Sequence, residues 1–150
     1  MLEIKRELYN YCLRFAEERI NAAEQAIKDA QDASVNDTKS SAGDKYETTR
    51  EMMQQEISRN QAQLTEARKL KHALNQINPD KKYDSVQNGS LVITDNGAFY
   101  LSISAGQIKH QDKIYFAISA FSPVGRNLMG LKKGDAFAFN GKKFEIIDLA

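Results

Sequence analysis

Three carboxylates lie within one short polar stretch of the chain: Asp37, Asp44 and Glu47. Carboxylate oxygens are the ligands that Mg²⁺ prefers, and such acids can share an ion and its activated water with ligands from a partner. The same spacing also has a structural explanation, because Ser41, Asp44 and Glu47 follow one another at helix-capping intervals. Both explanations stay open at this point. We expect no metal to be bound by the protein alone.

The other reactive side chains do not form a catalytic set. Cys12 is the only cysteine, so an internal disulfide is excluded. His72 falls on a predicted helix and His110 in a predicted loop, with no partner for a Ser–His–Asp or Cys–His arrangement or a zinc site. We therefore expect a protein that is not an enzyme and has no cofactor.

Charge and hydropathy restrict the possible partners. The 150 residues carry 21 Lys+Arg and 20 Asp+Glu, a net charge of +1, which gives no overall attraction to nucleic acid or an acidic membrane. The N-terminal residues lack the apolar core of a signal sequence, and no run of about 18 uncharged apolar residues occurs. These features predict a cytoplasmic protein.

Residues 2 to about 34 predict a long helix. This stretch has no Pro or Gly and is rich in Ala, Glu, Lys, Arg and Gln. A second apolar set, confined to its first half, predicts that this half is also covered by the C-terminal domain; its members are Ile4, Leu8, Tyr11, Cys12 and Phe15. The main seam has the 3.5-residue spacing of a coiled coil and comprises Leu2, Arg6, Tyr9, Leu13, Ala16, Ile20, Ala23, Ile27 and Ala30.

A second helix is predicted from Asp44 to about Ile77, where Asn78 and Pro79 end it. Asn60 and Lys71 interrupt its apolar seam, as register-fixing polar residues do in coiled coils. The complete seam comprises Met53, Ile57, Asn60, Leu64, Ala67, Lys71 and Leu74.

Two such helices predict an antiparallel hairpin over residues 1–78 with its tip at about residues 35–44. About 30 residues give each arm a length of roughly 45 Å. Towards the tip the seam narrows to small side chains, which bury little apolar area. We interpret the hairpin as a rod that reaches a partner, with a dimer pairing along Ile20 and Ile27 as the alternative.

Residues 79–150 predict a small antiparallel sheet domain with one short helix, so that the fold class is α+β. Strand-like runs flank Asn96-Gly97 and Asn140-Gly141, which are hairpin turn signals. A further strand is predicted over residues 114–118. Ser122 as N-cap, Pro123 at the first position and Gly130 at the end predict the helix.

Two segments of the chain resemble the Gre family of bacterial transcript-cleavage factors. Residues 118–135 are similar to the family's pattern of a strand, Ser-Pro, a short helix ending in Leu-x-Gly, and Gly-Asp before the next strand. Residues 41–51 are similar to its Ser-Glu-Asn-Ala-Glu-Tyr…Arg-Glu segment at the hairpin tip. The two segments occur in the family's order, and together they cover both halves of the chain.

The resemblance implies a transcription regulator that binds RNA polymerase. The C-terminal domain would be FKBP-like and bind the outside of the polymerase, while the hairpin enters the secondary channel and comes near the nascent RNA. Mg²⁺ would then be present only in the complex, and the protein itself a monomer or weak dimer. The implied polymerase-docking residues are Ser122, Pro123, Arg126, Lys132, Lys133 and Asp135; the three basic ones also suit a solvated face.

The chain departs from the family at the tip. Aligned on Ser41, Tyr46 and Arg50, the family's catalytic Asp falls at Lys39 and its catalytic Glu at Ala42. A lysine there would repel a further cation. We therefore expect a regulator that occupies the channel without stimulating cleavage.

Three alternatives remain beside that expectation. The protein is a genuine cleavage factor if Asp37, Asp44 and Glu47 replace the missing acids. It is a peptidyl-prolyl isomerase if the FKBP-like domain has an aromatic-lined pocket, although most of its aromatic residues are needed for the core. It is a coiled-coil adaptor if it forms a stable dimer.

Overall fold

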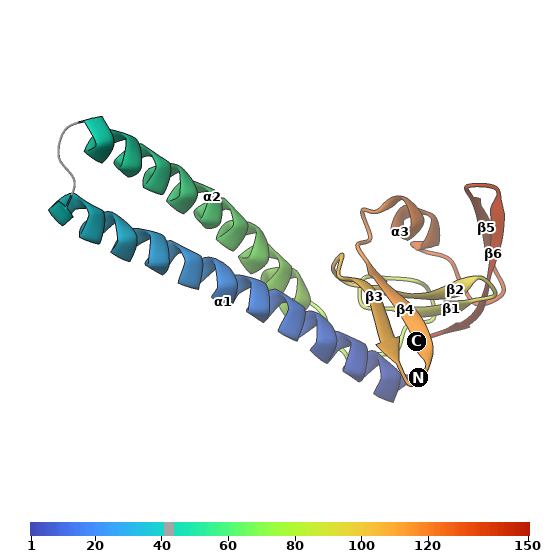
Figure 1. Ribbon diagram of the computed structural model, residues 1–150. Coiled ribbons are helices and arrows are strands. Elements are labelled where there is room, and N and C mark those ends of the chain that lie inside the picture. The colour runs from blue at the N-terminus through green and yellow to red at the C-terminus, as the bar shows by residue number, and fades with distance from the viewer. Residues whose placement is uncertain (41–43) are drawn as a thin grey trace. The chain divides into compact units, whose positions relative to one another are not determined.

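The computed structural model describes residues 1–40 and 44–150, and the side chains of all residues outside 36–46. Two long helices come first, α1 (Leu2–Ser40) and α2 (Asp44–Asn75), and a sheet with one short helix follows (Figure 1). This order confirms the α+β class. Helix α1 continues past the predicted end near residue 34.

The chain forms two compact units. The hairpin unit comprises Ala16–Lys71, and the sheet unit comprises Met1–Phe15 together with His72–Ala150. The division does not follow one cut in the sequence, because the first fifteen residues belong with the sheet. Each unit is described separately below.

The hairpin unit pairs α1 and α2 along the predicted seam. On α1, Ala23 and Ala30 are buried, and on α2 Ile57, Leu64 and Ala67 are buried. Ile20 and Ile27 are half-buried within this same seam. The dimer predicted to pair along Ile20 and Ile27 stays a prediction.

Polar residues of the hairpin seam are accommodated locally. Asn60 is buried and its Nδ2 donates to the Glu56 carbonyl one turn earlier on the same helix, 3.0 Å away. The Lys71 ammonium lies 3.7 Å from a carboxylate oxygen of Glu17 on α1. Of the two, only Lys71 makes an interaction between the helices that could favour one register.

The sheet unit contains six strands in the order β3-β4-β2-β1-β6-β5. Neighbours are antiparallel except β2 and β4, which run parallel with Phe99 opposite Phe116. The sheet is therefore mixed, whereas an antiparallel sheet was predicted. The strands are β1 (Leu91–Thr94), β2 (Gly97–Leu101), β3 (Gly106–His110), β4 (Lys113–Ile118), β5 (Ala136–Phe139) and β6 (Lys142–Leu149).

Two-residue turns join three pairs of strands, two of them predicted. Asn140 and Gly141 both have positive φ and connect β5 to β6, as their residue types require. Asp95 and Asn96 connect β1 to β2, one residue earlier than the predicted Asn96-Gly97, because Gly97 is already paired with Thr94 as the first residue of β2. The third hairpin, β3–β4, was missed, and the prediction of a loop at His110 is wrong because that residue ends β3.

One face of the sheet carries the main core. Helix α3 (Pro123–Leu128) contributes Leu128 to this core, and the segment between α2 and β1 contributes Val86. Phenylalanines fill the layer between, with the Phe137 and Phe144 rings stacked 5.0 Å apart between centroids. The buried members are Val86, Val92, Phe99, Leu101, Leu128, Phe144 and Ile146.

The first turns of α1 are packed within the sheet unit. Leu8 and Cys12, one turn apart, are fully buried, and Cys12 Sγ lies 3.6 Å from Ser102 Oγ beyond the end of β2. Tyr9 donates from its hydroxyl to the Leu74 carbonyl at 3.1 Å. The contact of Cys12 with Ser102 agrees with the prediction that the second apolar set of α1 packs against the C-terminal part of the chain.

Candidate functional site

Of the residues predicted to act at the hairpin tip, the structure describes the side chain of Glu47. The side chains of Asp37, Lys39 and Asp44 lie outside the described residues. Glu47, in the first turn of α2, is exposed to solvent. Among the described residues no three His, Cys, Asp or Glu side chains come together as a metal site.

The segment before and within α3 is a second candidate, and its geometry is well defined. Ser122 has an extended backbone and caps the helix, its Oγ accepting from the Gly125 amide at 3.1 Å. The same Oγ donates to the Ser119 carbonyl at 2.6 Å, and Ser119 Oγ accepts from the Phe121 amide at 3.0 Å. Both hydroxyls therefore fix the turn that leads into α3, as the capping prediction requires.

Gly125 leaves no room for a side chain. A Cβ at this position would lie 2.1 Å from the Ser119 carbonyl oxygen, which belongs to the backbone and cannot turn aside. Beyond the helix, the Gly130 amide donates to the Val86 carbonyl at 2.9 Å, and the Val86 amide to the Leu131 carbonyl at 2.8 Å. Segment 119–131 is thus held at both ends.

This rigid segment presents an apolar side chain to solvent. Phe121 is 82% exposed, the highest value among the large apolar residues of the described chain, and Met129 at the other end of α3 is 40% exposed. Pro123 and Arg126 are exposed between them. Exposed aromatic and arginine side chains on a fixed backbone are typical of protein-binding hot spots.

Sequence reasoning named Ser122, Pro123 and Arg126 in this segment but missed Phe121. Phe121 lies inside the segment that carries the family resemblance, but no role was predicted for it.

Lys132, Lys133 and Asp135, the other predicted docking residues, lie in the turn before β5. The Asp135 carboxylate accepts from the Lys132 amide at 2.8 Å, and the Asp135 amide donates back to the Lys132 carbonyl at 2.9 Å. Asp135 therefore builds the turn. Lys132 and Lys133 are exposed, and no contact places them with Phe121 in one surface.

A buried polar cluster within the sheet unit was not predicted. The ammonium of Lys5, whose side chain is fully buried, donates to the Lys81 carbonyl at 2.5 Å and lies 4.7 Å from the centre of the Tyr83 ring. Arg6 beside it pairs with Asp80 at the surface. The Tyr100 hydroxyl is buried without a hydrogen-bond partner among the described residues.

Burial governs the titration of this cluster. It lowers the pKa of the Lys5 ammonium to about 8. It raises the pKa of the Cys12 thiol, against a smaller lowering by the hydrogen bond with Ser102, and it raises the pKa of the Tyr100 hydroxyl, with further contributions from neighbouring Cys12, Tyr9 and Tyr83. A buried thiol with a raised pKa is a poor nucleophile, so Cys12 fits a structural role.

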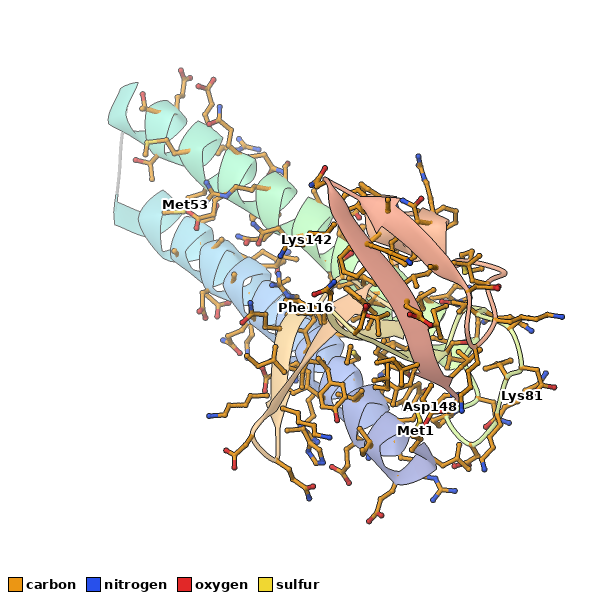
Figure 2. The ribbon with its side chains drawn as sticks, turned by 90° about the vertical axis from the view of Figure 1, so that its right-hand side faces the viewer. Met1, Met53, Lys81, Phe116, Lys142 and Asp148 are labelled. Atoms are coloured by element: carbon orange, nitrogen blue, oxygen red, sulfur yellow. The ribbon has the colours of Figure 1, made fainter. Side chains whose placement is uncertain are left out.

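A groove of about 530 Å³ lies on the sheet unit, and Met1 and Asp148, which Figure 2 labels, are among the residues that line it. Its wall is mostly aliphatic, formed by Ile4, Ile93 and half-exposed Ile114 and Ile147. Tyr115 is its aromatic member and is 2% exposed. This lining does not favour the isomerase alternative, which needs an aromatic-lined pocket.

Comparison with known proteins adds no relative: no family model, no curated protein and no solved structure matches the chain. Within the described residues, neither long helix is apolar enough to cross a membrane.

Proposed function

We propose that this protein is a transcription regulator that binds RNA polymerase, docking through segment 119–131 and extending its hairpin into the polymerase's secondary channel. The observation that carries the proposal is Phe121, an 82% exposed aromatic ring on a segment whose two ends are fixed by hydrogen bonds. A backbone held in this way loses little conformational entropy on binding. Arg126, on α3 within the same segment, adds a charged contact.

The hairpin supports the second half of the proposal. Its seam between Ala16 and Ala30 consists largely of alanine, so that the pair of helices stays slender. Helix α1 is also long, because it runs without interruption from Leu2 to Ser40. A slender rod joined to a docking surface is suited to reach into a narrow opening of a large partner.

The binding half is tested with bacterial core RNA polymerase and the purified chain. Phe121→Ala is expected to weaken binding about tenfold or more, as expected for a central aromatic anchor. The matched control is Ile114→Ala. It shortens a half-exposed apolar side chain that lies on β4, outside segment 119–131, and is expected to leave the affinity for the polymerase unchanged. No binding by the native chain at micromolar concentration would exclude the proposal.

The tip is proposed to act without catalysing RNA cleavage. Lys39 and Ala42 occupy the positions at which the resemblance requires acids, and a lysine near the catalytic metals disfavours a further cation. The native chain should bind a backtracked transcription complex without accelerating its cleavage. Lys39→Asp combined with Ala42→Glu should then introduce cleavage stimulation while leaving affinity for the polymerase nearly unchanged.

Cleavage by the native chain would contradict this assignment. Asp44→Ala and Glu47→Ala distinguish the reason, because loss of activity in both would assign the chemistry to these acids. Unchanged activity in both would show that the acceleration comes from elsewhere in the complex.

A further inference from the structure

The two edge strands of the sheet differ in how they are protected. Strand β3 carries the exposed side chain of Lys109, and lysines on edge strands disfavour pairing with other chains. Strand β5, at the other edge, consists of Ala-Phe-Ala-Phe and has neither a charged residue nor a proline. Its Ala136 and Ala138 are exposed. The edge of β5 is therefore suited to accept a further strand.

The hydrogen-bonding groups of this edge have a fixed direction. The Ile146 amide donates to the Asp135 carbonyl at 2.8 Å, so that the carbonyl at the start of β5 faces β6. Backbone groups alternate in direction along an antiparallel strand. Ala136 and Ala138 therefore direct their N–H and C=O groups away from β6, towards the place of an added strand.

A second copy of β5 can satisfy these groups symmetrically. An antiparallel arrangement about a two-fold axis at Phe137 places Ala136 opposite Ala138 of the second copy, and Ala138 opposite its Ala136. Both pairs are of the hydrogen-bonded kind, because the backbone groups of both alanines face the added strand. The two Phe137 side chains then form the closely spaced pair at the axis.

The same arrangement continues the aromatic layer of the sheet unit. Phe137 is half-buried and stacks on its register partner Phe144, with 5.0 Å between ring centroids, and Phe144 is in edge contact with Phe99. Around the axis this row runs from Phe144 through both Phe137 rings to Phe144 of the second copy. Aromatic side chains directly opposite each other on neighbouring strands stabilise their pairing. A second copy therefore covers the ring that the single chain leaves half-exposed.

The opposite face of the β5–β6 hairpin is complementary in charge about this axis. Glu145 is the register partner of Ala136, and Lys143 is the register partner of Ala138; all four residues are exposed. The axis therefore places Glu145 in one row with Lys143 of the second copy, and does so twice. Their backbones are three strand spacings apart, about 14 Å. Only alanines lie between them, so the two long side chains are free to lean towards each other.

Other charged residues on the elements around β5 are of both signs and add no second complementary pair. Asp135 accepts from the Lys132 amide and belongs to the turn of its own chain. These residues are Asp95, Arg126, Lys132, Lys133, Asp135 and Lys142. We therefore assign the attraction between copies to Lys143 and Glu145.

We propose that β5 is a homodimer interface, at which two copies pair edge to edge about a two-fold axis at Phe137 and join their sheets. A strand of four residues forms the contact, so the dimer is a weak and reversible one. An unrelated strand could satisfy the same backbone groups, but it would have to supply an aromatic ring, an acid and a base at matching positions. The proposal does not depend on polymerase binding.

The test is sedimentation equilibrium of the full chain at low salt, over concentrations up to the millimolar range. Ala138→Pro should raise the dissociation constant about tenfold or more, because it removes an outward N–H twice and spares the hydrogen bonds to β6. Lys143→Glu and Glu145→Lys should each raise it about fivefold, because each places like charges in one row twice. The double variant Lys143→Glu/Glu145→Lys should restore dimerisation.

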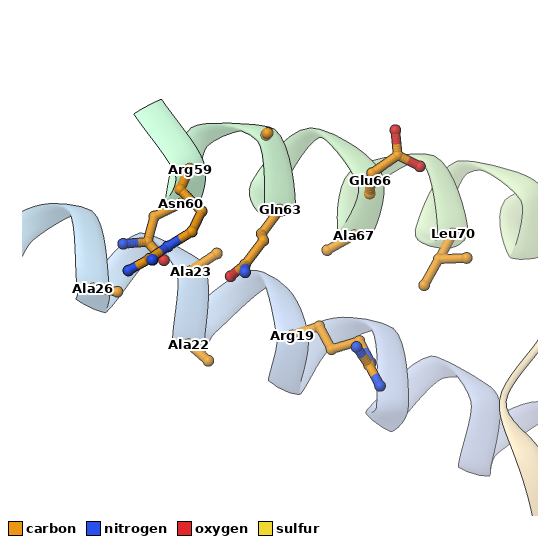
Figure 3. Close-up of a pocket in the computed structure, with 11 residues that line it drawn as sticks. Arg19, Ala22, Ala23, Ala26, Arg59, Asn60, Gln63, Glu66, Ala67 and Leu70 are labelled. Atoms are coloured by element: carbon orange, nitrogen blue, oxygen red, sulfur yellow. The ribbon is translucent and has the colours of Figure 1, made fainter. Parts of the chain in front are cut away.

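Glu66→Lys is the matched control. It reverses the charge of an exposed residue that lines a groove of about 700 Å³ on the hairpin unit (Figure 3). The dissociation constant should stay unchanged, whereas an increase would assign the contact to the hairpins and contradict the proposal. Circular dichroism checks that Ala138→Pro retains the sheet; if it does not, the charge variants decide.

Three further results would overturn the proposal. They are a native chain that stays monomeric throughout, a folded Ala138→Pro variant that dimerises as tightly as the native chain, and a double charge variant that remains as weak as the single ones. Since the chain is measured alone, none of them bears on polymerase binding.

Discussion

The two units bury different kinds of side chain. In the sheet unit the core consists of phenylalanine, leucine, isoleucine and valine, with rings such as Phe99 and Phe144 in edge contact at 6.1 Å between centroids. In the described part of the hairpin unit, alanines provide most of the buried apolar positions, joined by Ile57 and Leu64. Both units use regular secondary structure, but only one has a core of large side chains.

Because of this difference, we expect the two units to differ in stability. Burial contributes about 25 cal/mol per Å² of apolar surface, so an alanine contributes far less than a phenylalanine or leucine. The hairpin unit relies more on residues with high helix propensity, such as Ala, Glu, Gln and Lys. We therefore expect the hairpin unit to open more readily than the sheet unit.

The largest expected effect comes from shortening a leucine in each unit. Leu128→Ala should destabilise the sheet unit by about 4 kcal/mol, because Leu128 is fully buried in a close-packed core. Leu64→Ala should cost the hairpin unit about 2 kcal/mol, since its neighbours are small and solvent is near. Hydrogen exchange measured for each unit provides both values. Equal costs would contradict the comparison.

Adding one methyl group should also be costly in the sheet unit. Gly125→Ala should destabilise it by about 2 to 3 kcal/mol, because the new Cβ meets the Ser119 carbonyl oxygen. Gly130→Ala is the control: its Cβ would have open space, and only its φ of +84° opposes it, at about 1 kcal/mol. Urea denaturation followed by circular dichroism distinguishes the two. The larger effect in Gly130→Ala would refute the steric explanation.

Replacing the buried amide of the hairpin seam should stabilise that unit. Asn60→Leu is expected to contribute about 1.5 kcal/mol, because an asparagine at a seam position reduces coiled-coil stability. Its hydrogen bond to the Glu56 carbonyl is local and is replaced by the helix's own bonding. Gln63→Leu, on an exposed position of α2, should change stability by less than about 0.5 kcal/mol. Thermal unfolding of both variants measures the two changes in stability. A stability of Asn60→Leu no higher than that of the native chain would contradict the prediction.

Removing the buried charge of the sheet unit should have the smallest effect and a characteristic pH dependence. Lys5→Met retains the apolar stem and removes the ammonium, and should stabilise the unit by about 1 kcal/mol at pH 7. The pKa of the Lys5 ammonium, about 8 in the folded chain, lies below its ordinary value of 10.5 because of burial. Between these values the unfolded chain binds more protons, so native stability gains from Lys5 as pH rises.

The advantage of Lys5→Met should therefore shrink between pH 8 and pH 10. Urea denaturation of both proteins across this range isolates Lys5, because Cys12 and Tyr100, whose raised pKa values oppose the gain, are present in both. An advantage independent of pH would mean that the stabilisation does not come from the ammonium.

Local sequence signals were sufficient for the local parts of the fold. The seam of the hairpin unit, the turn at Asn140-Gly141 and the cap at Ser122 each depend on residue types a few positions apart, and each was predicted. Strand β3 was missed because only Ile108 within it is buried, so it lacks the alternation that identifies a half-buried strand. An edge strand of this kind can be recognised only from its pairing with the neighbouring strand, here β4.

Interactions between distant residues were beyond the sequence. The parallel pairing of β2 with β4 arises from a crossover around β3, and no local pattern encodes it. The burial of Lys5 likewise depends on Lys81 and Tyr83, far along the chain. Of the candidate site, the short helix and its Ser122 cap were predicted. The exposure of Phe121 was not, because a lone phenylalanine has the same local signature inside and outside a core.

The position of β1 between β2 and β6 has a consequence for synthesis on the ribosome. Strand β1 pairs along one side with its neighbour in sequence and along the other with β6, near the end of the chain. Residues 16–71 can pair as soon as α2 has left the exit tunnel, whereas the sheet has to wait for β6. During that interval β1 has an open edge that other nascent chains can reach, so slow translation of residues 100–149 should increase misassembly.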